Sequence, residues 1–399
     1  MQLLQLSSGC ESEIVRNMSV TDLLRPNIRK LVPYRCARDD YKVGILLDAN
    51  ENTSVTAVSD LSEAEKRLDL NRYPDPHLVD VKQLLCNLRN AEAAKSGLPA
   101  SLAPQNICLG VGSDESIDAL QRALCRPGTD KILICPPTYG MYKVSADIND
   151  LSVVSVPLDE NFDLQTDKII EKLQADPTIK MALACSPGNP TGKLLKMDDI
   201  LKITRAWTGG VVVVDEAYVD FSGPSCATLV TENERLAVLQ TLSKSFGLAG
   251  LRCGVTFAHE NLAIALNSMK APYNISSITA ELARRALSPA SIKIMRDGVA
   301  QIVAERARMV AELPKIDGLG KIVGGLDANF VMVQVLDKAG GVPSNEHALK
   351  IYKLLAETKQ VVVRYRGNEL NCVGCLRISI GTKDENDTVI QVLEEALSE

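Results

Sequence analysis

Lys244 and Arg252 stand eight residues apart among glycine, alanine and serine, in a stretch (residues 241–254) that begins at the end of an apolar run. A lysine in such a tight turn loses hydration, and the arginine adds a second positive charge nearby. Both effects favour the neutral amine, which attacks carbonyl groups. We therefore predict that Lys244 forms a Schiff base; the alternative is an ordinary exposed lysine at the start of a helix.

Asp215 follows four consecutive valines and precedes Tyr218 by three residues. In open α/β sheets ligands bind beyond the carboxyl ends of the strands, so this carboxylate is placed where a ligand would sit. It could hold a pyridinium nitrogen protonated while Tyr218 reaches a ring hydroxyl. From the pattern alone, binding a metal ion and capping a helix are equally good interpretations of Asp215.

Ser113 and Asp114 follow a glycine, between a predicted strand and a helix predicted at residues 116–124. Small residues at a helix N-terminus leave backbone N–H groups free beside the positive end of the helix dipole, which suits a phosphate. The alternative is an ordinary helix cap. Ser243 and Arg252 favour the phosphate, because a hydroxyl and a guanidinium suit the same anion.

Asn189 lies in a loop rich in proline and glycine (residues 186–192), directly after a strand predicted at residues 181–185. The prolines and glycines impose an irregular backbone, and the amide offers both a donor and an acceptor. We predict that Asn189 faces a ligand; the alternative is a simple turn.

Short apolar runs alternate with helical patterns from about residue 107 onward. Those predicted to be buried strands lie at residues 131–135, 151–156, 181–185, 210–215, 236–242 and 253–257. Near-continuous apolar strands separated by helices indicate a mostly parallel sheet covered on both faces, hence an α/β domain. A long helical region at residues 278–313, followed by strands at residues 330–335, 361–363 and 376–380, indicates a small α+β domain.

Three parts of the chain are predicted. They are an N-terminal arm that joins the small domain (residues 1–45), a large ligand-binding domain (46–275) and a small C-terminal α+β domain (276–399). The boundary is expected within a helix near residue 275, because no linker rich in glycine or serine separates the domains. A strand is expected near residues 44–48.

The composition of the 399 residues restricts the partners. With 44 basic and 50 acidic side chains the net charge is −6, which predicts neither a nucleic acid nor a membrane surface as partner. Purely aliphatic runs such as residues 211–214 are far shorter than the roughly 20 residues of a membrane span. Because the N-terminus also lacks a basic, apolar leader, the expected location is the cytoplasm.

Eleven cysteines, several of them inside predicted strands, are typical of reduced thiols used as small hydrophobic residues. Cys372 and Cys375 have a spacing that can bind zinc, but no second pair accompanies them and the chain has only three histidines. We predict a turn before a strand at this place, and no metal site.

Five motifs occur in a characteristic order: Gly-Ser-Asp-Glu (112–115), Pro-Pro-Thr-Tyr-Gly-Met-Tyr (136–142), Ser-Pro-Gly-Asn-Pro-Thr-Gly (186–192), Asp-Glu-Ala-Tyr (215–218) and Thr-Leu-Ser-Lys-Ser-Phe (241–246). In this order they resemble the fold type I pyridoxal-phosphate (PLP) aminotransferases. Segments 71–76, 249–254 and 374–379 resemble the histidinol-phosphate aminotransferases within that family. The resemblance covers residues 21–383 and implies the family fold, a mostly parallel seven-stranded sheet covered by helices plus a small α+β domain.

The resemblance implies a set of residues around the ring of the cofactor PLP. Lys244 would form the Schiff base with the cofactor and shuttle the proton between cofactor and substrate. Asp215 would pair with the pyridinium nitrogen, Tyr218 and Asn189 would bind the ring hydroxyl, and Tyr139 would stack on the ring face.

A second set of residues would bind the cofactor phosphate. The resemblance implies backbone contacts at Ser113 and Asp114, and side-chain contacts from Ser243 and Arg252. Tyr73 would reach the same phosphate from the neighbouring subunit, so a homodimer with shared active sites is expected.

The implied reaction is transamination between L-histidinol phosphate and 2-oxoglutarate, which gives imidazole acetol phosphate and glutamate in histidine biosynthesis. Arg377 resembles the family arginine that binds the glutamate carboxylate, and Arg364 and Tyr34 match positions that meet the phosphate of the amino donor. Carboxylate and phosphate both accept from the guanidinium fork, so this arginine pair could serve both half-reactions. Which arginine binds which anion is left open.

Three other functions fit parts of the pattern. A PLP-dependent decarboxylase of a phosphorylated amino acid shares the fold and the phosphate-facing arginines, and it would release carbon dioxide from threonine phosphate. An aminotransferase for aromatic amino acids would prefer phenylalanine to histidinol phosphate. A regulatory protein with this fold would lack Lys244 or carry an added DNA-binding domain, and the sequence shows neither.

Overall fold

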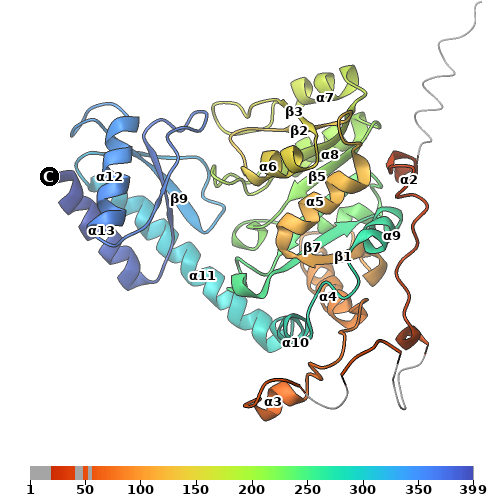
Figure 1. The fold of residues 1–399 in the computed structure, drawn as a ribbon. Coiled ribbons are helices and arrows are strands. Elements are labelled where there is room, and N and C mark those ends of the chain that lie inside the picture. The colour runs from red at the N-terminus through yellow and green to blue at the C-terminus, as the bar shows by residue number, and fades with distance from the viewer. Residues whose placement is uncertain (1–18, 41–47, 53–55, 399) are drawn as a thin grey trace, which may run out of the picture.

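The computed structural model describes residues 19–40, 48–52 and 56–398, which form two β-sheets with helices around them (Figure 1). The strands of the larger sheet are β1 (Ile107–Val111), β2 (Lys131–Ile134), β3 (Ser152–Ser155), β4 (Ile179–Cys185), β5 (Val211–Asp215), β6 (Leu236–Thr241) and β7 (Cys253–Ala258). Their order is β1-β7-β6-β5-β4-β2-β3. Only β7 runs antiparallel to its neighbours, so the predicted mostly parallel α/β sheet is confirmed.

The central strand β5 shows why both faces of this sheet are covered. Val212 and Val214 lie in one hydrophobic core, whereas Val211 and Val213 lie in the other, because successive side chains of a strand point to opposite faces. Helices that contribute to the first core are α4 (Val79–Lys95), α7 (Thr166–Ala175), α8 (Met197–Ala206) and α10 (Ser277–Ala286). Those of the second are α2 (Val20–Leu23), α5 (Gly112–Leu124), α6 (Met141–Ile148) and α9 (Glu260–Met269).

The helix expected at residues 116–124 begins earlier, because α5 includes the whole Gly-Ser-Asp-Glu motif. Glu115 accepts a hydrogen bond from the backbone N–H of Val111, which satisfies a donor at the start of the helix. The motif is therefore the first turn of α5 and does not precede the helix.

The smaller sheet has strands β8 (Leu319–Val323), β9 (Phe330–Val335), β10 (Arg364–Tyr365) and β11 (Cys375–Ser379), in the antiparallel order β10-β11-β9-β8. Helices α11 (Pro289–Glu312), α12 (Asn345–Glu357) and α13 (Lys383–Ser398) accompany it. The strand expected at residues 361–363 is wrong in position. Val363 is buried in this core, but pairing with β11 begins only at Arg364.

The helical region expected at residues 278–313 is divided into α10 and α11. Ser288 caps α11 by accepting from the backbone N–H of Ser291, and Pro289 occupies the first turn, where its missing N–H costs nothing. These two residues start a new helix, so the region cannot be continuous. None of the helices within the described ranges is long and apolar enough to cross a membrane.

Helix α11 extends from the large sheet and its helices to the small sheet (Figure 1). Leu287, just before it, lies in a core of the large sheet, whereas Met309, near its end, lies in the core of the small sheet. Residue 275 lies in the loop between α9 and α10 and not within a helix. The division into domains at that residue stays a prediction.

The described part of the N-terminal arm packs on the large sheet. Val20, Leu23 and Leu24 are buried in the same core as α5 and α9, and the backbone N–H of Val20 donates to Glu234 at 3.0 Å. The predicted association of the arm with the small domain stays a prediction. The strand expected near residues 44–48 lies outside the described residues, apart from Asp48.

Cys372 and Cys375 lie at a turn that leads into β11, and both are buried. The predicted turn before a strand is therefore confirmed. Across residues 19–40, 48–52 and 56–398, no group of three or more metal-ligating side chains could hold a metal ion.

Candidate active site

Lys244 lies in the loop that follows β6, at the carboxyl end of the strand. Its Nζ is 5.6 Å from the ring centroid of Tyr218, and it makes no hydrogen bond or ion pair with any residue that the structure describes. Partial burial of the ammonium is the main cause that lowers the pKa of Lys244, and the positive charges of Arg377 and Arg252 lower it further, against the opposing charge of Asp215. These are the conditions that favour a neutral, nucleophilic amine.

Asp215 ends β5 and is only 3% exposed. One carboxylate oxygen accepts from the Tyr142 hydroxyl at 2.7 Å, and the other from the backbone N–H of Ala217 at 3.2 Å. Burial is the main cause that raises the pKa of this carboxyl. No cation among the described residues contacts this buried carboxylate, which fits the protonated ring nitrogen of PLP, whose charge would stabilise the ionised form.

Tyr142, on α6, is a site residue that sequence reasoning missed. Its place in the Pro-Pro-Thr-Tyr-Gly-Met-Tyr motif could have pointed to a role at the site. However, the side chain is fully buried, and its spacing along α6 is that of an ordinary core residue. The ring meets that of Tyr139 edge to face, with centroids 5.6 Å apart. The Tyr139 hydroxyl in turn donates to Asp114 at 3.1 Å. The Tyr139 ring therefore connects the start of α5 with Tyr142, the partner of Asp215.

The start of α5 packs directly on Arg252 and Gly254. Val111 and Cys253 are paired in the β1–β7 ladder, and the backbone N–H of Gly112 donates to the carbonyl of Arg252 at 3.1 Å. A Cβ on Gly112 would overlap Nη2 of Arg252, and a Cβ on Gly254 would overlap the backbone of Gly112. Because the two glycines have no side chain, the backbone at the start of α5 stays accessible beside the Arg252 guanidinium. Such an arrangement suits a phosphate, and we call it the phosphate cradle.

Ser243 and Asp114 complete this cradle. The Ser243 hydroxyl accepts from Thr241 Oγ1 at 2.8 Å, which leaves its own hydrogen available. Nη2 of Arg252 lies 3.8 Å from the Asp114 carboxylate, a long contact between exposed side chains. Ser113 and Asp114 thus lie beside Arg252, and Ser243 is connected to them through Thr241, which pairs with Gly254 in the β6–β7 ladder.

Asn189 faces the small sheet from the loop that follows β4. Its side-chain oxygen accepts a hydrogen bond from Nη1 of Arg377 on β11. The Arg377 guanidinium carbon also lies 5.0 Å from the centroid of Phe330, and that ring meets Tyr218 edge to face at 5.4 Å. Arg377 is therefore joined to the residues that follow β4 and β5, two of the three strands whose ends carry predicted site residues.

Arg377 retains hydrogen-bonding capacity for a ligand. Its Nε is buried and has no hydrogen-bond partner among the described residues. Burial is the main cause that lowers its pKa, with contributions from Arg366 and Arg364. A buried guanidinium with a free donor, close to other positive charges, suits an anion such as a carboxylate.

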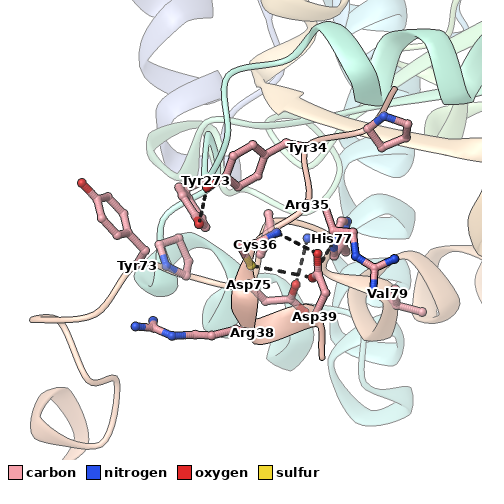
Figure 2. Close-up of a pocket in the computed structure, with 13 residues that line it drawn as sticks. Tyr34, Arg35, Cys36, Arg38, Asp39, Tyr73, Asp75, His77, Val79 and Tyr273 are labelled. Carbon is pink, nitrogen blue, oxygen red and sulfur yellow. Dashed lines mark hydrogen bonds and ion pairs between the residues drawn. The ribbon is translucent and has the colours of Figure 1, made fainter. Parts of the chain in front are cut away.

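Tyr34 and Tyr73 lie in a separate cluster around Tyr273 (Figure 2). The Tyr73 and Tyr273 rings stack with centroids 4.7 Å apart, and the Tyr34 ring meets Tyr273 edge to face at 5.6 Å. The Tyr273 hydroxyl is 3.3 Å from that of Tyr34. Within this one chain, the structure does not bring Tyr34 and Tyr73 into contact with Lys244 or Arg364.

A buried network beneath the Lys244 loop was also missed from the sequence. The Ser245 hydroxyl donates to Asp220, and Asp220 accepts from Nη1 of Arg89 at 2.7 Å. Nε of Arg89 donates to Gln240 on β6 at 2.7 Å. The signal in the sequence was an arginine on the buried, mostly apolar face of α4, where Lys82 is the other charged residue. The network connects the residue next to Lys244 with the sheet and α4.

The chain matches the family described as aminotransferase class I and II over residues 42–393. It is 50% identical over 387 residues to the histidinol-phosphate aminotransferase of Candida maltosa, covering 95% of this chain and 98% of that protein. Identity to the Schizosaccharomyces pombe histidinol-phosphate aminotransferase is 52% over 380 residues, covering 94% and 97%. A solved structure with a similar fold is the Sinorhizobium meliloti histidinol-phosphate aminotransferase in complex with pyridoxal-5'-phosphate, with a TM-score of 0.70 and 22% identity over 83% of this chain and 84% of that one.

Proposed function

We propose that this chain, which belongs to the class I and II aminotransferases, catalyses PLP-dependent amino transfer between L-histidinol phosphate and 2-oxoglutarate in histidine biosynthesis. The main support for this choice of substrate is the identity of about 50% to histidinol-phosphate aminotransferases over almost the whole of both chains. The products would be imidazole acetol phosphate and glutamate.

The cofactor would be held by the cradle and the strand ends described above. When bound, PLP supplies an electron-accepting ring that stabilises negative charge at the substrate carbon. Asp215 would pair with the ring nitrogen, held in place by Tyr142. Asn189 and Tyr218 would donate to the ring hydroxyl, and Tyr139 would cover one ring face.

The phosphate of the cofactor would lie at the start of α5. Backbone N–H groups at Ser113 and Asp114 would donate to it beside the positive end of the helix dipole. The Ser243 hydroxyl and the Arg252 guanidinium would complete the contacts. Because these groups bind the phosphate independently of Lys244, they would retain the cofactor while the lysine is released to move a proton.

Lys244 would act as the general base and acid at the reacting carbon. Its lowered pKa raises the fraction of neutral amine, which can accept the proton of the substrate Cα. Ser245 and Asp220 would fix the loop that carries it. Arg377 would bind the carboxylate of glutamate or 2-oxoglutarate, and Arg364 with Tyr34 would meet the phosphate of the amino donor.

A homodimer with shared active sites is part of the proposal. Tyr73 is 54% exposed, and its ring stacks on Tyr273, which the Tyr34 ring also contacts. From this exposed position Tyr73 would reach the cofactor phosphate of a second copy of the chain. A cytoplasmic location is proposed as well, on the ground of cysteines placed inside apolar strands.

The visible spectrum of the purified protein tests the function. We expect histidinol phosphate to remove the absorbance of the lysine-bound cofactor and 2-oxoglutarate to restore it. The specificity constant for histidinol phosphate should exceed that for phenylalanine. An unchanged spectrum with histidinol phosphate, or release of carbon dioxide from threonine phosphate, would contradict the proposal.

A further inference from the structure

Arg364, Arg366 and Arg377 stand on one face of the small sheet. Arg364 and Arg377 are direct partners in the antiparallel β10–β11 ladder, and the backbone N–H of Arg366 extends it by donating to Cys375 at 2.8 Å. Because side chains alternate along a strand, Arg364 and Arg366 point to the same face, whereas Tyr365 points into the core of the small sheet. The ladder therefore groups three guanidinium-bearing side chains.

Arg366 faces the candidate active site. Burial raises the pKa of Tyr218 to about 12, and Arg377 and Arg366 act in the opposite direction because their positive charges stabilise the phenolate. Geometry places Arg366 on this side of the small sheet, because its backbone partner Cys375 is buried in a core of the large sheet and Arg377, on the same face, donates to Asn189. The phenol of Tyr218 belongs to the ring 5.6 Å from Nζ of Lys244.

Arg366 also has a free donor. Its side chain is only 22% exposed, and its buried Nε has no hydrogen-bond partner within the described part of the chain. Its one ion pair with a described residue is a 3.5 Å contact between Nη1 and Glu369, three residues further along the chain. A buried polar donor without a partner is costly, and a ligand oxygen at this position would satisfy it.

The charges around these three arginines do not balance. Glu369 is the single carboxylate in an ion pair with any of them among the described residues, so an excess of positive charge faces the site. Burial and the neighbouring arginine charges lower the pKa of both Arg366 and Arg377. A phosphate carries about −1.5 to −2 charges and three acceptor oxygens, enough for two guanidinium forks, whereas a carboxylate suits one.

We propose that Arg366 is a specificity-determining residue that, together with Arg364, binds the phosphate of the amino donor. This inference rests on the proposed function. Glutamate and 2-oxoglutarate, which lack a phosphate, would not need Arg366, and the residue would then stay with Glu369. Arg366 would thus favour phosphorylated donors without assisting the acceptor half-reaction.

The test compares histidinol phosphate with histidinol, which lacks only the phosphate, in the wild type and in Arg366→Gln. We expect the substitution to raise KM for histidinol phosphate by at least about 10-fold, since a hydrogen bond to a charged group is lost. Turnover of histidinol, kcat with histidinol phosphate and KM for glutamate should each change less than about 2-fold. Inorganic phosphate should inhibit the wild type competitively, and the variant more weakly.

Two further variants separate binding from a merely structural role. Arg366→Lys keeps the charge without the fork and should give an intermediate KM for histidinol phosphate. Glu369→Gln removes the neighbouring carboxylate and should leave that KM unchanged or lower it. Equal losses for histidinol and histidinol phosphate in Arg366→Gln, or no loss for either, would overturn the inference alone. A wild type that does not prefer histidinol phosphate to histidinol would overturn the proposed function with it.

Discussion

The Tyr142 hydroxyl donates a 2.7 Å hydrogen bond to the carboxylate of Asp215, and both side chains are buried. Burial, followed by the charge of Asp215, raises the pKa of Tyr142 well above its ordinary value, so the phenol remains a donor. The same hydrogen bond lowers the pKa of Asp215 against the effect of burial. Tyr142 therefore both orients the carboxylate and helps to keep it ionised for a cationic ring nitrogen.

Tyr142→Phe is expected to weaken cofactor binding while the fold persists, because the ring remains and only the donor is lost. A hydrogen bond to a charged group contributes about 1.5–3 kcal/mol, so affinity for PLP should fall by about 10-fold or more. Fluorescence titration of the cofactor-free protein measures this. Tyr352→Phe, on α12, serves as the control and should bind PLP normally. Equal affinities in both variants would show that Tyr142 has only a packing role.

Lys244→Ala is expected to abolish the absorbance of the lysine-bound cofactor and to reduce kcat by at least about 100-fold, because a positioned proton-transfer group is removed. Absorbance spectra and steady-state rates measure the two effects. Lys143→Ala, which removes an exposed lysine from α6, is the control. An undiminished rate in Lys244→Ala would be incompatible with the role proposed for this lysine.

Gly112→Ala is expected to weaken PLP binding by at least about 10-fold, because the added Cβ displaces the Arg252 guanidinium. Gly97→Ala is a matched control, since Gly97 also has a positive φ but nothing lies within 4 Å of its Cβ position. Both variants should lose about 1–2 kcal/mol of unfolding free energy from backbone strain. Thermal unfolding measures the loss of stability that both variants share, and PLP titration measures the loss of PLP affinity expected only in Gly112→Ala. A similar loss of PLP affinity in Gly97→Ala would argue against the cradle.

Glu51→Gln is expected to change how stability depends on pH. The hydrogen bond from Arg38 is the main cause that lowers the pKa of Glu51 from 4.5 to about 2, with further bonds from Arg72 and the backbone of Tyr73. A lowered pKa stabilises the fold above pH 4.5, and that contribution is lost as the pH falls toward 2. Glu51→Gln should therefore lower the unfolding free energy by about 1–3 kcal/mol at pH 7, and the deficit should shrink on acidification toward pH 3.

Urea unfolding of the wild type and Glu51→Gln at several pH values measures that difference. Glu63→Gln is the control, because the Glu63 side chain is 80% exposed in its pair with Lys66. It should cost less than about 1 kcal/mol at every pH. A deficit for Glu51→Gln that does not vary with pH would contradict the electrostatic origin.

The sequence alone determined the fold class and the strand ends that carry Asn189, Asp215 and Lys244. Each of these residues follows an apolar run that reads as a buried strand, and the three strands, β4, β5 and β6, are neighbours in the sheet. The carboxyl ends of parallel strands meet at one edge, so local patterns were sufficient to predict that these side chains converge. The same holds for Ser113 and Asp114, although the helix includes them.

Only the tertiary structure decided which residues support those side chains. Tyr142 and Arg89 occupy core positions of helices, where periodicity does not distinguish a packing residue from the partner of a distant carboxylate. Arg366 has the ordinary pattern of an exposed loop arginine until β10 and β11 pair and place it on the same face as Arg364 and Arg377. Contacts of this kind depend on which segments the fold brings together, and spacing along the chain carries no information about them.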